Sequence, residues 1–348
     1  MTIKTIENMV GVVQYGNNVK YRIYTDLAEI RGLFQQWEDL VAASQCNKVF
    51  ASLEWYLASC RMDTSGTPFV IAAFRGSEMT CILPLVLNRT VGVAKFPNYG
   101  SDYNDVVVRG SNPALVADLL RYALSVATPL RHLKLSRLRP DSNCLLALPY
   151  FKHESNIECR HSIIDSFFYA ELPSSFEDYL ASLGRKFRKN IRRALRAAAA
   201  TNGLTICELY PESLHPAELP DIFFQLLLCR HSHMGLPEQI KTQSFVSEVL
   251  PVMFRKGSMR VFGLLEEERI IAIMLFFVAA QGLLAWNGGF LAGKEQWSPG
   301  TSLYAFAIRQ AIAEGLHELD LGAGDEDYKL HWTNREYRIS EVELISKY

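Results

Sequence analysis

The chain has 348 residues, of which 49% are apolar and 21% charged, the composition of a soluble globular protein with about two domains. Its formal net charge of −1 argues against a chain whose whole surface binds nucleic acid through positive charge. The seven cysteines include no Cys-x-x-Cys pair, which favours reduced thiols in a cytosol over a disulfide framework or a zinc site.

No targeting or membrane-spanning pattern stands out along the chain. The first residues, Met1–Glu7, contain no apolar run, so the sequence predicts no signal peptide. The longest apolar run, Ile270–Ala280, is too short to span a bilayer and is interpreted as a buried strand. We therefore expect a cytoplasmic protein, with the inner face of the membrane as a second location to consider.

The first half of the chain alternates helical and strand patterns after a lead-in without periodicity. Apolar spacing predicts a helix over Leu27–Ala43 and a second one over Leu53–Cys60. Two apolar runs around Gly76 predict a hairpin, and a polar, turn-rich segment follows at Tyr99–Asp105. Asn112-Pro113 opens a helix that runs to about Ala127, and a strand follows it.

The second half repeats this order of elements. The offset between matching segments drifts only from 191 to 186 residues, and the three matches are Val70–Leu87 with Val261–Val278, Ala114–Ala127 with Ser302–Glu314, and Leu130–Leu135 with Leu316–Leu321. The pattern predicts a duplicated α/β (α+β) fold. Its two domains, 1–160 and 161–348, would each be a mixed, mostly antiparallel sheet flanked by helices.

A strongly basic helix is predicted at the start of the second domain. Seven of the twelve residues 185–196 are basic and none is acidic. Ser174 and Glu177 form a capping-box pattern that places a helix start just upstream. A solvated surface face is one interpretation, but such faces usually mix charge signs. The pattern therefore favours an anionic partner: a phosphorylated substrate, a CoA phosphate, tRNA or an anionic membrane surface.

The last eighty residues carry the best candidate for a ligand site. A loop of small residues, Trp297–Thr301, lies between an apolar strand and the amphipathic helix Ser302–Glu314. The first N–H groups of a helix have no intrahelical partner, so this loop predicts an anion site. A strand and a Gly-rich acidic turn, Gly322–Lys329, complete the stretch.

Groups able to transfer protons cluster around this turn. Asp320 lies at the strand end, and Glu326, Tyr328 and Lys329 follow within nine residues. The alternative is that the acids only complement a helix N-terminus. His231 and His233, two residues apart, do not share a helix face, so no metal site is predicted; His231 is either a substrate contact or a helix C-terminal residue.

Four patches resemble one family. They are Ser101-Asp102-Tyr103-x-Asp105, Phe187–Arg193, Ser298-Pro299-Gly300, and Asp320-x-Gly322-x-Gly324-x-x-x-Tyr328-Lys329. In this order they resemble the GNAT-fold acyltransferases, and more narrowly the tandem, FemAB-like type linked to cellulose and exopolysaccharide synthesis. The resemblance covers most of the chain from about Asn47 on.

The resemblance implies an N-acyltransferase that moves an acetyl or other acyl group from acetyl-CoA to an amine on a cell-envelope or exopolysaccharide precursor. It assigns the donor pyrophosphate to Ser298, Gly300, Thr301 and Ser302, and the oxyanion to backbone N–H groups near Trp286–Gly288. Asp320 or Glu326 would be the base and Tyr328 the acid. Substrate contacts would come from Lys329, Arg188, Arg192, Asp102, Tyr103 and His231.

Two alternatives remain open at this stage. The usual donor-binding signature keeps only one glycine here, Gly300, so FemAB-like use of aminoacyl-tRNA is an alternative donor chemistry. A non-catalytic scaffold of a polysaccharide synthase is the other. The partners implied are an acyl-CoA, an amino-sugar or polysaccharide precursor that is lipid- or nucleotide-linked, and a membrane or synthase complex contacted through the basic helix.

Overall fold

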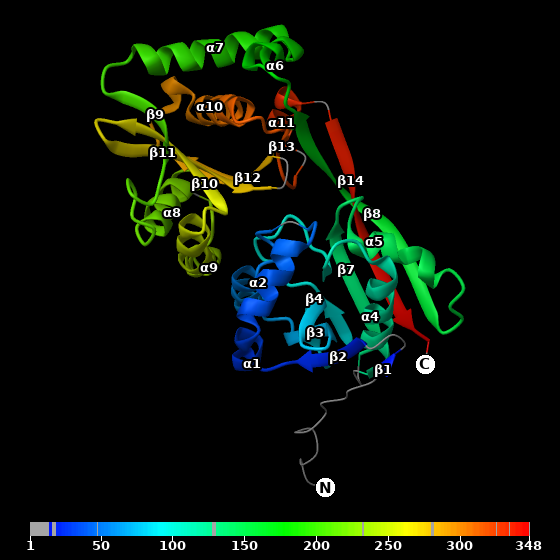
Figure 1. Cartoon of the computed structure of the whole chain (residues 1–348). Coiled ribbons are helices and arrows are strands. Elements are labelled where there is room, and N and C mark those ends of the chain that lie inside the picture. The colour runs from blue at the N-terminus through cyan, green and yellow to red at the C-terminus, as the bar shows by residue number, and fades with distance from the viewer. Residues whose placement is uncertain are drawn as a thin grey trace. The chain divides into compact units, whose positions relative to one another are not determined.

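The computed structural model describes residues 14–15, 19–46, 48–126, 130–231, 233–279, 282–324, 326–333 and 335–347 (Figure 1). The chain divides into two compact units. The first unit comprises Met1–Asp165 and Arg338–Tyr348, and the second comprises Ser166–Tyr337. The strands β8 (Ile157–Glu171) and β14 (Arg335–Ser346) carry the chain from the first unit into the second and back again.

The first unit is a sheet covered by helices on both faces. Its strands follow the order β1-β2-β3-β4-β5-β7-β14, and β6 pairs with β4. The element bounds are β1 (Gln14–Tyr15), β2 (Val19–Tyr24), α1 (Leu27–Gly32), α2 (Phe34–Ala43), α3 (Leu53–Met62), β3 (Thr67–Arg75), β4 (Glu78–Asn88), β5 (Val93–Lys95), β6 (Val107–Val108), α4 (Pro113–Val126), β7 (His132–Leu138), α5 (Asn143–Ala147) and the 3-10 helix η1 (Leu148–Phe151).

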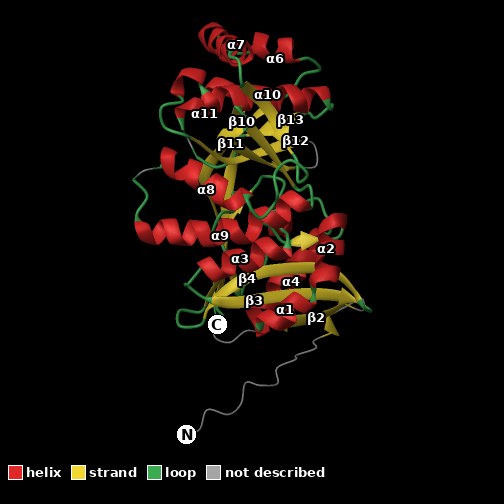
Figure 2. Cartoon of the chain, turned by 90° about the vertical axis from the view of Figure 1, so that its left-hand side faces the viewer, coloured by secondary structure: helices red, strands yellow, loops and turns green. Residues whose placement is uncertain are grey.

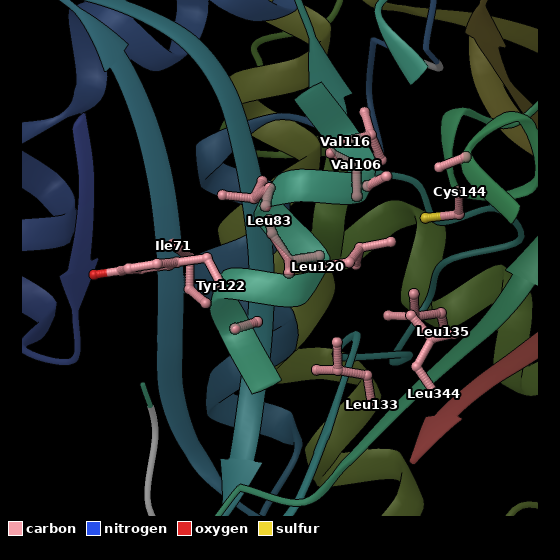
Figure 3. Close-up of a cluster of buried hydrophobic side chains, with 14 of the residues drawn as sticks. Ile71, Leu83, Val106, Val116, Leu120, Tyr122, Leu133, Leu135, Cys144 and Leu344 are labelled. Carbon is pink, nitrogen blue, oxygen red and sulfur yellow. The ribbon is translucent and has the colours of Figure 1, made fainter. Parts of the chain in front are cut away.

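Alternate residues of its central strands fill two separate cores. In β3, Ile71 joins the side chains of α4 in one buried cluster, whereas its neighbour Val70 joins those of α1, α2 and α3 in another. Figure 3 shows the first of these clusters, in which Ile71 and Leu83 lie near Leu120 of α4. A strand buried on both faces needs a nearly continuous apolar sequence, which explains why β3 and β4 have little polar alternation.

The second unit repeats this plan. Its sheet has the order β8-β13-β12-β11-β10-β9. The helices α6, α7, α10 and α11 lie on one side of the sheet and α8 and α9 on the other (Figures 1 and 2). The bounds are α6 (Phe176–Ser182), α7 (Arg185–Ala200), β9 (Leu204–Leu209), α8 (Leu219–Arg230), α9 (Leu236–Arg255), β10 (Met259–Glu266), β11 (Arg269–Val278), β12 (Gly282–Phe290), the 3-10 helix η2 (Glu295–Trp297), α10 (Pro299–Ala313), β13 (Glu318–Asp320) and α11 (Asp327–Trp332).

The repeated order of elements extends to irregular details. The β3–β4 hairpin has a register shift between Ala73 and Phe74, and the β10–β11 hairpin has one between Leu264 and Leu265. These two positions are 191 residues apart, the offset of the sequence match. In each unit the strand after the hairpin pairs in parallel with the strand after the following helix: β5 with β7, and β12 with β13. The mixed, mostly antiparallel fold expected from the sequence is thus confirmed.

Three sequence expectations differ from the structure in detail. The helix expected over Leu27–Ala43 is two helices, because Gly32, a poor helix former, is followed by a break at Leu33. The cap of α6 is Ser175, not Ser174; Ser175 has the extended backbone that a cap needs and accepts the N–H of Asp178 at 3.1 Å.

The third difference concerns the C-terminal boundary. The sequence division at 160/161 assigned everything after it to the second domain. In the structure, residues 338–348 belong to the first unit, because β14 pairs with β7 through contacts such as Leu344 opposite Leu133.

Candidate functional site in the second unit

The strands β12 and β13 stop pairing just before a β-bulge in β12. They pair in parallel only from Gly282 to Leu284, whereas the pairing of β12 with β11 continues to Phe290. Leu275 lies opposite Asn287 and the next residue, Phe276, lies opposite Ala285, so Trp286 is the extra residue. Among the described residues, β13 has no ladder partner in residues 285–290. A bulge of this kind bends the strand and exposes backbone groups at its edge.

Two glycines after the bulge allow other backbone segments to approach. A Cβ on Gly288 would lie 2.6 Å from the carbonyl oxygen of Ile273, and one on Gly289 would lie 2.3 Å from the carbonyl carbon of Leu226 in α8. The end of α8 therefore packs directly on β12. There Arg230, the last residue of α8, donates to the carbonyl oxygen of Gly288 at 3.2 Å. The bulge thus has a cation beside it.

The N-terminus of α10 follows η2 after a strained residue. Ser298 is left-handed (φ 46°, ψ 59°), and its side chain makes no capping hydrogen bond. Pro299 has no N–H, while Gly300 and Thr301 are half-exposed at the second and third helical positions. A Cβ on Gly300 would meet open space. The helix start therefore presents amide groups without a side-chain cap, as an anion site requires.

Ser302 has a different position from the other residues predicted to bind the donor. Its side chain is fully buried, and its hydroxyl donates to the carbonyl oxygen of Trp297 at 2.9 Å. Its N–H donates to the carbonyl oxygen of Ser298. The two hydrogen bonds of Ser302 thus hold the backbone of residues 297–298 in place on the buried side of the loop.

Asp320, at the end of β13, is buried, and both of its carboxylate oxygens accept hydrogen bonds. Its Oδ1 accepts the N–H of Gly322 at 2.8 Å, and its Oδ2 accepts the phenol of Tyr337 at 2.5 Å. Its exposed fraction is 3%. The carboxylate therefore holds the first turn of the following loop against β14.

Lys329 closes the same loop from α11. Its ammonium is 2% exposed and donates to the carbonyl oxygens of Gly322, Ala323 and Gly324. It also forms an ion pair with Glu326 at 2.9 Å. A buried ammonium with this many acceptors organises the loop. The structure thus directs the ammonium of Lys329 into the loop, where its described partners are the three carbonyl oxygens and Glu326. Asp325, part of the acidic turn, lies outside the described residues.

Glu326 and two tyrosines form the electrostatic centre of the site. Burial alone would raise the pKa of Glu326, but the hydrogen bond and charge of Lys329, together with the charge of Arg230, hold it below its ordinary value. Burial raises the pKa of Tyr304 well above its usual range, and a hydrogen bond with Tyr328 adds to this effect. The rings of Tyr304 and Tyr328 lie 6.3 Å apart, centroid to centroid.

Of the residues expected to contact substrate, two arginines lie on α7 and His231 lies at the end of α8. Arg188 donates to the last carbonyls of α6, and Arg192 pairs with Glu177 at 2.6 Å, both on α7. His231 caps the C-terminus of α8, and burial, Arg230 and His233 lower its pKa. His231 directly follows Arg230, the residue whose charge acts on Glu326.

Asp102 and Tyr103 belong to the first unit and make contacts there. Arg137, itself in the left-handed region (φ 61°), approaches Asp102 at 3.9 Å and donates to the carbonyl oxygen of Ser101. The guanidinium of Arg139 lies 5.1 Å from the ring centroid of Tyr103, which is buried. Both predicted residues are thus parts of a polar cluster within that unit.

Sequence reasoning missed three contributors to the site. Arg230 was present in the run that drew attention to His231, but only contact across β12 reveals its role. Tyr304 looked like one more apolar position of an amphipathic helix. Tyr337 carried no local signal, because its partner Asp320 is 17 residues away.

The described residues were also considered as possible metal ligands and membrane-spanning helices, and they form neither. Among the described residues, no group of three or more His, Cys, Asp or Glu side chains could hold a metal ion. Within the same part of the chain, none of the helices is both long and apolar enough to cross a bilayer.

Comparison with known proteins places the site in a recognised domain. The family described as "Acetyltransferase (GNAT) domain" matches residues 185–330. The whole chain is similar in fold to FemX, with a TM-score of 0.62 at 12% identity over 88% of this chain and 95% of FemX. No curated protein matches the sequence.

Two further solved structures share the fold. One is L-PGS from Bacillus licheniformis, with a TM-score of 0.56 at 10% identity over 93% of each chain. The other is the C-terminal domain of a putative lysylphosphatidylglycerol synthetase from Agrobacterium fabrum, with a TM-score of 0.54 at 14% identity over 90% of this chain and 92% of that one. At such identities the likeness concerns the fold alone.

The family match and the fold agree. Residues 185–330 of the second unit form a GNAT acetyltransferase domain, which supports an acyltransferase, and the fold of the chain is similar to that of FemX. The bulge in β12, the start of α10 and the loop closed by Lys329 all lie within the matched residues.

Proposed function

We propose that the chain transfers an acyl group, acetyl in the first instance, from a CoA thioester to an amine on a cell-envelope or exopolysaccharide precursor. The proposal rests on two observations in the same unit, the end of β12–β13 pairing before the bulge at Trp286 and the uncapped start of α10. The first supplies an open strand edge for a thioester. The second supplies free amides for a pyrophosphate.

The donor would be held by backbone groups. The N–H groups of Gly300 and Thr301 would bind the pyrophosphate, with Ser298 shaping the turn and Ser302 supporting it from below. The thioester oxygen would accept the N–H of Gly288. That N–H here donates to the side chain of Asn287 at 2.8 Å, an interaction that a bound carbonyl oxygen would replace.

The chemical step would be direct attack of a neutral amine on the thioester carbonyl carbon. A C–N bond forms, the C–S bond breaks, and the amine proton passes to the carboxylate of Glu326, directly or through water. The lowered pKa of Glu326 keeps this carboxylate ionised at neutral pH. The phenol of Tyr328 would give its proton to the departing thiolate, so the products are an amide and free CoA thiol.

Asp320 and Lys329 would act as positioning residues in this scheme. Both are buried and both hold the loop that carries Glu326. Asp320 is therefore a weaker candidate for the base than Glu326, which has an exposed fraction of 55%.

The decisive test is calorimetric binding of acetyl-CoA to the wild-type chain and to Gly300→Asp. A side chain fits in the open space at Gly300, and an acid near a helix start favours the helix, so the variant should fold. The new carboxylate should repel the pyrophosphate, and we expect affinity to fall at least about tenfold, or about 1.4 kcal/mol. The matched control is Gly184→Asp at the N-cap of α7, which also meets open space.

The outcomes separate the candidate functions. Micromolar binding that is lost in Gly300→Asp and kept in Gly184→Asp supports a CoA donor at α10. Absence of binding by the wild-type chain would contradict the proposal and leave the aminoacyl-tRNA donor and the scaffold as the remaining candidates.

A further inference from the structure

The outward side of α7 is a continuous row of cations, which we call the basic face. It consists of Arg185, Lys186, Arg188, Lys189, Arg192, Arg193 and Arg196. Arg188, Arg192 and Arg196 have partners within α6 and α7. The other four are exposed, and the described part of the chain provides no ion pair for any of them.

The buried side chains of α7 hold the helix in one orientation, which keeps the cations on its solvent side. Ile191 is fully buried, and Ala194 and Ala198 are buried beside it. Phe187 packs edge-on against Trp332 of α11, with 4.8 Å between ring centroids. Figure 1 shows α7 at the outer side of this unit, with α10 between it and the sheet.

The charges of the basic face are poorly compensated within the chain. Arg185 and Lys186 occupy the first turn, at the positive end of the helix dipole, where no acid and no side-chain cap are present. Arg185, Lys189 and Arg193 repel one another at successive i,i+4 spacings. An arrangement that is unfavourable within the folded chain is explained if an external anion balances it.

The shape of the face selects among anions. It is the convex side of one helix, about 16 Å long from Arg185 to Arg196 at 1.5 Å per residue. None of the exposed large hydrophobic residues lies on α7. Proteins that bind single-stranded RNA usually add aromatic side chains for base stacking, and the face offers none. A row of phosphates on a flat surface needs only charge and an unobstructed helix.

We propose that the basic face docks the second unit on an anionic lipid surface. Contact would be electrostatic, without insertion, because no large apolar side chain is available to enter the bilayer. α7 lies on α10, which carries the donor amides of the proposed function, so docking would bring those amides to about one helix diameter from the headgroups. Resting on that proposed function, the geometry points to a lipid-linked amine as the acceptor.

The test is sedimentation with vesicles of phosphatidylcholine alone and of phosphatidylcholine with 30% phosphatidylglycerol, without donor. The variant replaces the four unpaired cations: Arg185→Gln, Lys186→Gln, Lys189→Gln and Arg193→Gln. Glutamine keeps helix propensity, so α7 should remain folded. At about 1 kcal/mol for each cation near the surface, partitioning onto anionic vesicles should fall roughly 10²–10³-fold. Binding by the wild-type chain should also weaken as salt rises.

The matched control removes the same charge elsewhere, through Arg89→Gln, Lys152→Gln, Arg255→Gln and Arg269→Gln, all at exposed positions. It should bind vesicles as the wild-type chain does. Equal losses in both variants, no wild-type binding at low salt, or binding to an RNA hairpin but not to vesicles would each overturn the proposal. Acetyl-CoA calorimetry on the basic-face variant tests the two proposals separately. The variant should bind acetyl-CoA as the wild-type chain does, even if it no longer binds vesicles.

Discussion

The phenol of Tyr337 donates to Oδ2 of Asp320 across 2.5 Å, joining the start of β14 to the end of β13. The other oxygen of the same carboxylate accepts the N–H of Gly322. Through these two bonds, one buried acid fixes where the sheet ends and where the loop carrying Glu326 begins.

Tyr337→Phe should destabilise the protein by about 1–3 kcal/mol, because it removes the phenol that donates to a buried carboxylate oxygen of Asp320. Urea unfolding measures the loss. The control is Tyr150→Phe, which removes an exposed phenol and should change stability by less than about 0.5 kcal/mol. A double-mutant cycle with Asp320→Ala should show a coupling energy of the same sign. Additive effects would mean that the two side chains act independently.

Lys329→Met should be among the most destabilising substitutions in the second unit. It removes the ammonium that three carbonyl oxygens and Glu326 share, so we expect a loss of about 3–5 kcal/mol. Lys347→Met, at a residue whose ammonium makes a single exposed contact, is the control. Equal stability of the two variants in urea unfolding would show that Lys329 does not organise the loop.

Tyr328→Phe tests the proposed acid. The phenol would be needed only as the thiolate departs, so kcat should fall about 10²-fold while the Kd for acetyl-CoA stays unchanged. Release of CoA thiol with amino-sugar acceptors measures kcat, and calorimetry measures the Kd. Tyr210→Phe removes an exposed phenol of the same unit and should leave both values as they are. An unaltered kcat in Tyr328→Phe would remove this assignment.

Asp105 should make the first unit more stable in mild acid. Burial raises its pKa from 3.8 to about 6, although backbone hydrogen bonds from Asn143 and Cys144 oppose the shift. Because the folded pKa is above the unfolded one, this contribution to stability is fully present below about pH 4 and is lost as the pH rises through about 6. Between pH 7.5 and pH 5 the gain should be about 1–2 kcal/mol.

The measurement is urea unfolding of the wild-type chain and of Asp105→Asn at both pH values. Other groups titrate in this range, so the informative quantity is the difference between the two proteins. That difference should change with pH, since asparagine does not ionise. A difference independent of pH would mean that Asp105 titrates alike in both states.

The sequence predicted the fold because its signals were local and repeated. Hairpins, amphipathic helices and the strand after each helix are patterns within about twenty residues, and the duplication supplied each of them twice. The loop at Ser298–Gly300 was identified for the same reason: small residues directly before a helix describe a helix start. The family resemblance added the identity of the chemistry, which no local pattern contains.

The parts of the site that the sequence did not predict depend on long-range register. The bulge at Trp286 exists only in relation to β11, and the contact of Arg230 with Gly288 requires α8 to pack on β12. Lys329 was expected to contact substrate, and its burial follows from the way three carbonyl groups turn toward it. The direction of such a side chain is set by contacts between loop segments and not by the sequence spacing of its neighbours.

The return of β14 to the first unit has a consequence for biosynthesis. Ribosomes deliver the chain from its N-terminus, and domains usually fold as they emerge. Here the second unit is continuous, from Ser166 to Tyr337, whereas the first lacks β14, the partner of β7, until residues 338–348 are made. The half of the protein that starts first is therefore the half that finishes last, and a stop codon near residue 337 would spare the second unit's sequence while leaving the first unit's sheet one strand short.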